Sequence, residues 1–228
     1  PLQRHDRPAA TLRPARRHLY QGESNWARPA EYADLLPSMI RAWRAQWGQG
    51  DFPFYLVQLP NYAQPDDPTA RGWAWLREAQ TRALIEPATG LAVTVDSADP
   101  KLLHPQNKPI VGQRLARLAE AGVYGLTVDW SGPVFTKLER EGAALRVHFD
   151  HASAGLIAAN LPPQAFEIAG EDRKFHPATA VIERDTVVVR SPQVPVPVAV
   201  RYAWTNAPEA NLYNGAGLPA APFRSDRW

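Results

Sequence analysis

A five-residue segment, QGESN, holds residue types that acyl transfer uses. Glycine lets a backbone N–H approach a reacting carbonyl, an asparagine amide can donate to a developing oxyanion, and a carboxylate can orient an imidazole. Gly22 and Asn25 are therefore oxyanion candidates, and Glu23 is a candidate orienting carboxylate. The segment also suits an ordinary turn in which Ser24 or Asn25 caps a helix, and the local pattern alone favours that turn. Ser24 lacks a nucleophile elbow, because Trp26 stands where the G-x-S-x-G pattern needs its second glycine.

A histidine in the segment LHPQNK is the candidate general base. His104 lies in a loop between a predicted strand and a predicted helix, and an imidazole with an ordinary pKa near ~6.5 suits proton transfer. Asp96 and Asp99 precede it on the same loop, and either carboxylate could accept its second N–H. The alternatives are an ordinary loop histidine and aspartates that form turns or cap a helix.

Five further side chains lie next to these segments and could contact a substrate. Trp26 and Tyr62 could stack on a sugar ring, and Gln58 lies next to the last residue of a predicted strand. Arg77 and Gln80 share a predicted helix, where they either line a cleft or face water. We expect all five to bind substrate, with core packing as the alternative for the aromatic residues.

Composition limits the other kinds of chemistry. The 228 residues include no cysteine, which removes disulfides, zinc–cysteine sites, iron–sulfur clusters and thiol nucleophiles. The six histidines form no H-E-x-x-H or H-x-x-E-H arrangement, so we expect no histidine metal site. Acyl transfer through an acyl-enzyme needs neither a metal nor an organic cofactor, and we expect none. No apolar run approaches the ~18 residues that span a bilayer, and we expect no membrane partner. The net charge is +2, and the basic excess lies in residues 1–17, which lack periodicity, so we expect no nucleic-acid partner.

The elements that must position these residues follow an α/β order. Helical spacing of apolar residues predicts helices over 29–47, 73–85 and 108–120. Short apolar runs bounded by proline or glycine predict strands over 54–59 and 91–95. Helices that alternate with strands favour a parallel sheet, and sites in such sheets form beyond the carboxyl ends of the strands.

The pattern changes near residue 129. From residue 134 onward, short alternating segments separated by turns are typical of an antiparallel sandwich or barrel. We therefore divide the chain into a poorly packed leader (1–17), an α/β region (18–128) and a β-rich region (129–228).

Eight ordered segments resemble the sialate O-acetylesterases, carbohydrate esterases of the SGNH hydrolase superfamily. They include YQGESNW, FYLVQLPNY, WLREAQ, LHPQNKPIVGQRLARLA and the last 31 residues, so that the resemblance runs from Tyr20 to the end of the chain. It implies a three-layer α/β/α hydrolase domain, part of which is present here, followed by a β-sandwich-like region. It also implies an O-acetylated sugar as substrate, most closely an O-acetylated sialic acid. Acetylated xylan or another glycan is the alternative within the class, and a non-catalytic carbohydrate-binding or structural module is the alternative outside it.

The resemblance also assigns roles to the candidate residues. His104 would be the general base for an attacking serine, and Gly22 and Asn25 would complete the oxyanion hole. Many relatives carry an aspartate two or three residues before the histidine, where this chain has leucine and lysine. Glu23 is therefore the expected orienting carboxylate, with Asp96 as the second choice.

Two departures from the family's pattern concern the amino-terminal part of the chain. Residues 1–19 contain no GQSN-type segment, which carries the nucleophilic serine in the family, and the apolar strand expected before Tyr20 is replaced by TLRPARRHL. We expect a fragment that is inactive alone, from an intact protein that is periplasmic or secreted. The sequence leaves the oligomeric state open.

Overall fold

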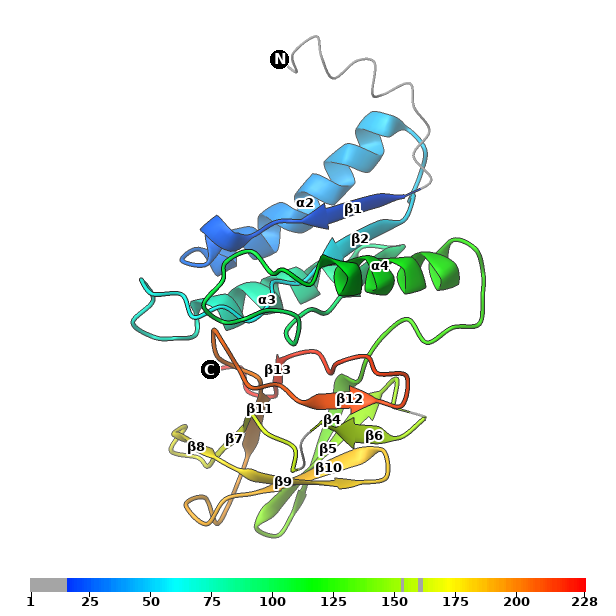
Figure 1. Cartoon of the computed structure of the whole chain (residues 1–228). Coiled ribbons are helices and arrows are strands. Elements are labelled where there is room, and N and C mark those ends of the chain that lie inside the picture. Colours follow the sequence, from blue (N-terminus) through cyan, green and yellow to red (C-terminus); the bar gives the residue numbers. More distant parts are fainter. Residues whose placement is uncertain (1–15, 153, 160–161) are drawn as a thin grey trace.

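The computed structural model describes residues 16–152, 154–159 and 162–228 of the chain. These residues form an α/β region followed by a β-rich region, as Figure 1 shows. No helix in the described ranges is long and apolar enough to cross a membrane.

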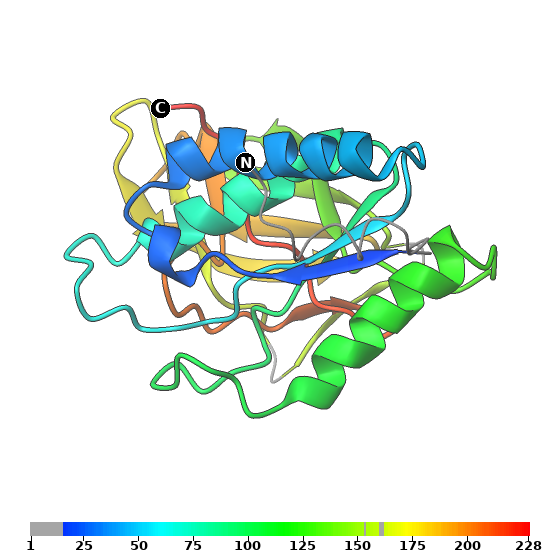
Figure 2. The same cartoon turned by 90° about the horizontal axis from the view of Figure 1, so that it is seen from above.

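The α/β region is built on three parallel strands in the order β1-β2-β3. The strands are β1 (Arg17–Tyr20), β2 (Phe54–Val57) and β3 (Thr89–Ala92). The helices are α2 (Pro29–Trp47), α3 (Gly72–Arg82) and α4 (Lys108–Gly122), with short 3-10 turns η1 (Glu23–Asn25) and η2 (Ala83–Ile85). Successive side chains of β2 point to opposite faces of the sheet. Phe54 and Leu56 pack against α2 and α3, whereas Tyr55 packs against α4, so helices cover both faces (Figure 2).

Helix α2 has the predicted bounds, and its ends follow from local chemistry. Pro29 occupies the first turn, where its missing N–H is not needed. Gly48 ends the helix with a left-handed φ of 62°, and its N–H donates to Arg44 O at 3.0 Å. Pro37 lies inside α2, and the helix continues through it.

The strand whose absence we expected before Gln21 is present, and this corrects the sequence analysis. Arg17–Tyr20 pair in parallel with β2, and Arg17 N donates to Pro53 O at 2.9 Å. The Arg17 guanidinium lies 4.5 Å from the centre of the Trp47 ring, and Leu19 packs against the α2–α3 core. Tertiary contacts thus make a strand of residues with little apolar pattern. Residues 1–15 of the expected leader lie outside the described residues, while Arg17 belongs to the sheet.

The β-rich region consists of two antiparallel four-stranded sheets and one strand pair. One sheet has the order β4-β5-β10-β9, formed by Val134–Glu141, Ala144–Asp150, Thr186–Arg190 and Thr179–Glu183. The other has the order β13-β11-β7-β8, formed by Phe223–Arg224, Ala199–Tyr202, Phe166–Ala169 and Phe175–Pro177. Strands β12 (Leu212–Asn214) and β6 (Leu156–Ala158) form the pair. The change of pattern near residue 129 lies in the connection between α4 and β4.

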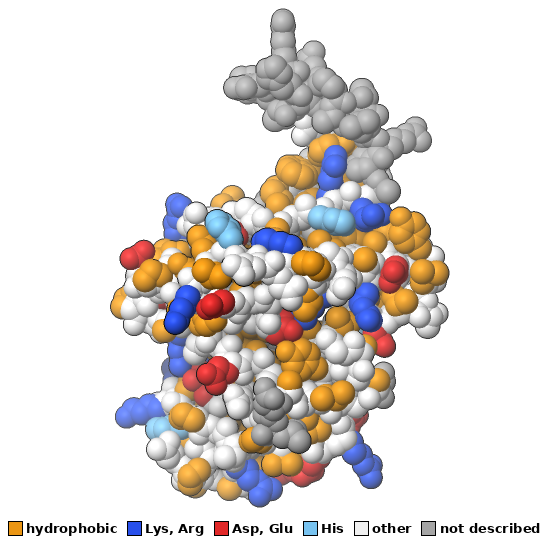
Figure 3. All heavy atoms as spheres, in the orientation of Figure 1, with side chains coloured by type: hydrophobic (Ala, Val, Ile, Leu, Met, Phe, Trp, Pro, Cys, Tyr) orange, Lys and Arg blue, Asp and Glu red, His pale blue; other side chains and the backbone are white. Residues whose placement is uncertain are grey.

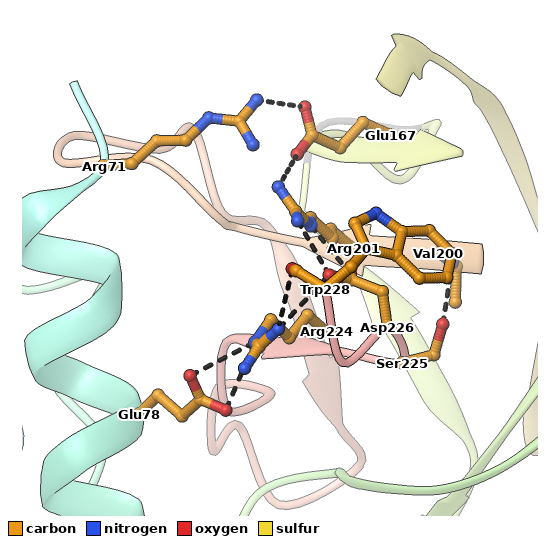
Figure 4. Close-up of polar contacts among 9 residues, drawn as sticks. All are labelled: Arg71, Glu78, Glu167, Val200, Arg201, Arg224, Ser225, Asp226 and Trp228. Carbon is orange, nitrogen blue, oxygen red and sulfur yellow. Dashed lines mark hydrogen bonds and ion pairs between the residues drawn. The ribbon is translucent and has the colours of Figure 1, made fainter. Parts of the chain in front are cut away.

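Charged side chains join α3 and the loop before it to the β-rich region, and we call these contacts the junction (Figure 4). From the α/β side, Arg71 pairs with Glu167 at 3.1 Å, and Glu78 accepts from Arg224 at 3.2 Å. Within the β-rich region, the buried Asp226 carboxylate accepts two bonds of 2.8 Å from Arg201. Burial alone would raise the pKa of Asp226, but its arginine partners lower it. Such pairs hold partners in one geometry, because a charge left unpaired in the interior is costly.

Candidate active site

The candidate site lies at the carboxyl end of the parallel sheet, where three connections leave β1, β2 and β3 (Figures 1 and 2). The connections are tied to one another. Ala98 N, after β3, donates to Asn61 Oδ1 at 3.2 Å, and Ala63 N, after β2, donates to Pro100 O at 2.8 Å. Lys108, at the start of α4, places its Nζ 4.9 Å from the centre of the Tyr20 ring at the end of β1. The loop that carries His104 and the QGESN segment therefore belong to one edge of the sheet.

The QGESN segment forms η1, and its glycine has a backbone conformation that only glycine adopts readily. Gly22 has φ of 142°, and its carbonyl accepts the N–H of Asn25 at 2.8 Å. Asn25 Oδ1 accepts from Gln21 Nε2 at 3.1 Å, which leaves the Asn25 amide N–H groups as donors. The segment is thus the turn that the alternative interpretation described, but neither Ser24 nor Asn25 caps a helix through its side chain. Both oxyanion candidates are held in this turn.

Glu23 is half-buried in the same turn, and its charge acts on two neighbouring tyrosines. Burial raises the pKa of Tyr20 and of Tyr32 to about 12, and the negative charge of Glu23 contributes to the rise. Both phenols therefore stay protonated at neutral pH and can act as hydrogen-bond donors.

His104 lies exposed in the loop between β3 and α4. Among the described residues, no hydrogen bond joins its imidazole to Glu23, Asp96 or another side chain. The structure thus brings Gly22, Glu23 and Asn25 together in one turn and places His104 on the neighbouring connection. Which carboxylate orients the imidazole stays a prediction.

Asp96 is engaged by a different partner. Its two carboxylate oxygens accept from Nη1 and Nη2 of Arg114 at 2.6 and 2.8 Å, and Arg114 Nη1 also donates to Val93 O at 2.7 Å. Both side chains are buried. This bidentate pair joins α4 to the loop that follows β3, so Asp96 supports the His104 loop at its base. Asp99 forms a turn by accepting Lys101 N at 2.9 Å.

Three of the five predicted substrate-binding residues are buried and bonded within the protein. Arg77 is 1% exposed and donates to the carbonyls of four residues on the two sides of the junction: Leu59, Pro60, Thr205 and Asn206. Burial lowers the pKa of Arg77. Gln58 donates to Arg77 O at 3.4 Å and to Thr81 Oγ1 at 3.2 Å, and Gln80 bonds backbone groups of Gln21, Val57 and Leu59. In this structure these three side chains are buried within the protein and do not face open space.

Trp26 and Tyr62, the two aromatic candidates, are half-buried. Trp26 packs so closely on Gly72 that a Cβ there would lie 2.7 Å from its ring, and the rings of Tyr62 and Trp73 are 5.2 Å apart. The described residues hold no group of three or more His, Asp or Glu that could bind a metal ion.

Sequence reasoning missed residues that act on the QGESN segment from outside it. Tyr32 and Gln80 both donate to the Gln21 carbonyl, at 3.1 and 3.0 Å. In the sequence, Tyr32 fits the apolar spacing of α2, and nothing near it in the chain indicates that its hydroxyl binds Gln21. Lys108 was visible within LHPQNK, but its position over Tyr20 depends on how the chain folds.

Comparison with solved structures gives a close match. The chain is 42% identical to a carbohydrate acetylesterase from Xanthomonas citri, with a TM-score of 0.92 over 97% of this chain. It spans 52% of that protein's chain, about half its length. The shared fold is the mixed α/β arrangement described above. No protein-family model and no curated protein matches the chain.

Proposed function

We propose that this chain is part of a carbohydrate O-acetyl esterase. The observation that carries the proposal is the match to the acetylesterase from Xanthomonas citri, at 42% identity over almost the whole chain. The placement of Gly22, Asn25 and His104 at one edge of the sheet supports it, because ester hydrolysis needs oxyanion donors and a base close to the same carbonyl.

In the proposed reaction, a serine oxygen attacks the acetyl carbonyl while His104 takes the serine proton. The negative charge that develops on the carbonyl oxygen is met by the Gly22 N–H and the Asn25 amide. The tetrahedral intermediate then collapses, the sugar oxygen leaves with the proton from His104, and water activated by His104 releases acetate. Glu23 is the proposed orienting carboxylate.

The serine is proposed to come from a segment outside this chain. Ser24 is exposed in η1 without an elbow around it. Ser97 is buried, and its hydroxyl donates to Thr94 O at 2.8 Å. The resemblance to the sialate O-acetylesterases supports a serine upstream of Tyr20.

We further propose an O-acetylated sialic acid as the substrate, and this finer assignment depends on the resemblance. A sialic acid carries a carboxylate, which a neutral acetylated sugar lacks. Lys108 is exposed at the site, and it could meet that carboxylate. Arg77 cannot, because backbone carbonyls already occupy its guanidinium.

The test measures acetate release from O-acetylated sialic acid and from an acetylated xylo-oligosaccharide. The chain is assayed alone and after fusion to the part of the Xanthomonas citri enzyme that has no counterpart here. We expect turnover only in the fusion and a loss of at least 1,000-fold in His104→Ala, with full activity in the matched control His176→Ala. No turnover in the fusion on either sugar would contradict the proposal, and sugar binding without turnover would favour a non-catalytic module.

The choice of sugar is tested separately. Lys108→Met in the fusion should raise KM for the sialic acid ester and leave KM for the xylo-oligosaccharide unchanged. Equal activity on both sugars with no effect of Lys108→Met would contradict the sialic acid assignment. From the resemblance we also expect the intact protein to be periplasmic or secreted, which cell fractionation would test.

A further inference from the structure

The pairing of β1 with β2 is interrupted by a side chain just before the QGESN segment. In a parallel ladder the hydrogen bonds alternate along each strand. Since Arg17 N donates to Pro53 O, the register makes Leu59 N and the Gln21 carbonyl partners in a rung beyond Tyr20 and Val57. That rung is not formed.

The amide of Gln80 occupies the place of the missing rung. Its Nε2 donates to Gln21 O at 3.0 Å, and its Oε1 accepts from Leu59 N at 2.9 Å. Nε2 also lies 3.3 Å from Val57 O. Gln80 is 2% exposed, so its amide is a fixed part of the sheet edge. One side-chain amide thus satisfies both backbone groups while it holds the two strands apart.

The hydrogen bond from Gln80 to the Gln21 carbonyl also sets the direction in which the Gly22 N–H points. The Tyr32 hydroxyl shares its one proton between the Gln21 carbonyl at 3.1 Å and Gln21 Oε1 at 2.9 Å, so side chains of α2 and α3 both lie on the same side of this carbonyl. Across a trans peptide, the N–H of the following residue points the opposite way. The Gly22 N–H therefore points away from α2 and α3, and among the described residues it has no hydrogen-bond partner. A buried backbone N–H without a partner is uncommon.

We infer that Gln80 is a positioning residue, which opens the sheet after β1 and, with Tyr32, presents the Gly22 N–H to a reacting carbonyl. The effect of Gln80 on catalysis rests on the proposed esterase function, whereas its effect on the backbone at Gln21 and Gly22 does not. The conformation of Gly22 fits this role, because a Cβ there would meet Leu76 at 3.3 Å and Gln80 at 3.4 Å. Gln80 thus acts through the glycine and not on the substrate.

The structural part is tested on the chain itself by amide NMR of three variants. Gln80→Met should move the cross-peaks of both Gly22 and Leu59, because it removes the donor to Gln21 and the acceptor for Leu59. Tyr32→Phe should move Gly22 and shift Leu59 less than Gln80→Met does, because the Tyr32 hydroxyl interacts with Gln21 and with the Gln80 amide but not with Leu59 itself. Thr81→Val is the matched control, since it removes a half-buried, hydrogen-bonded hydroxyl one residue along α3. Shifts at Gly22 in Gln80→Met no larger than in Thr81→Val would overturn the inference.

The catalytic part is tested in the fusion described above. Gln80→Met should lower kcat about 100-fold with KM changed less than about threefold, as loss of an aligned oxyanion donor does. A kcat equal to that of Thr81→Val would overturn the positioning role. If the unmodified fusion has no turnover, the proposed function fails. The amide NMR shifts of the three variants then decide by themselves whether Gln80 sets the direction of the Gly22 N–H.

Discussion

The junction and the His104 loop use polar side chains in opposite ways. At the junction, Arg77 is buried and gives its guanidinium hydrogens to four backbone carbonyls. Around His104, the imidazole is exposed and no partner is present among the described residues. On the face that Figure 3 shows, charged side chains are scattered over the α/β region without one dominant patch.

The difference separates residues that build the fold from residues that can do chemistry. A buried polar group whose hydrogen bonds are all used stabilises the protein but has nothing left to offer a substrate. An exposed group with free hydrogen-bonding capacity contributes little to stability and can meet a ligand. Gly22 has one group of each kind. Its carbonyl oxygen accepts a hydrogen bond from Asn25 N, whereas its N–H has no partner among the described residues.

The largest expected effect is at the junction. Arg77→Met leaves the Leu59 and Thr205 carbonyls without a donor and takes one of two donors from Pro60 and Asn206, so unfolding should become easier by about 3 to 5 kcal/mol. Urea unfolding measures this loss. Arg82→Met on the same helix is the matched control, because Arg82 is exposed, and it should change stability by less than about 0.5 kcal/mol. Equal stability of the two variants would show that the buried Arg77 contributes no more to the fold than the exposed Arg82.

A smaller loss is expected at Gly22. An alanine at φ of 142° is strained, and its Cβ would lie 3.3 Å from Leu76, so Gly22→Ala should cost about 1 to 3 kcal/mol. Gly112→Ala is a control of opposite sign, because nothing lies within 4 Å of a Cβ in that exposed helical position. It should stabilise the protein by up to about 1 kcal/mol. Thermal unfolding of both variants would show whether the turn is as constrained as we describe.

Acid should weaken the junction through Asp67. Burial alone would raise the pKa of Asp67, but hydrogen bonds from Thr69, the Gly72 amide and Asn206 lower it from 3.8 to about 2. A depressed pKa adds stability above the unfolded-state value, which is lost as the pH falls from about 4 to about 2. The contribution is roughly 1 to 2 kcal/mol after solvent screening. Asp67→Asn should therefore be less stable than the wild type at pH 6, with the gap in urea midpoint smaller at pH 2.

The smallest effect on stability is expected at His104. Because its imidazole is exposed and has no partner among the described residues, His104→Ala should change the free energy of unfolding by less than about 0.5 kcal/mol. The same variant should abolish turnover in the fusion. A loss of more than 1 kcal/mol would mean that the imidazole has a structural role.

The sequence by itself determined the α/β order, the bounds of α2, the antiparallel character of residues beyond 134, and the loops that carry Gly22 and His104. These features depend on periodicity and turn residues, which are local. Tertiary structure determined which polar residues are buried and which partners use their hydrogen bonds. Arg77 binds carbonyls up to 129 positions away, and Asp96 pairs with an arginine 18 positions on, so no local pattern reveals that their hydrogen bonds are used. It also made a strand of Arg17–Tyr20, because β2 supplies the backbone partners that four residues of mixed polarity could not supply for themselves.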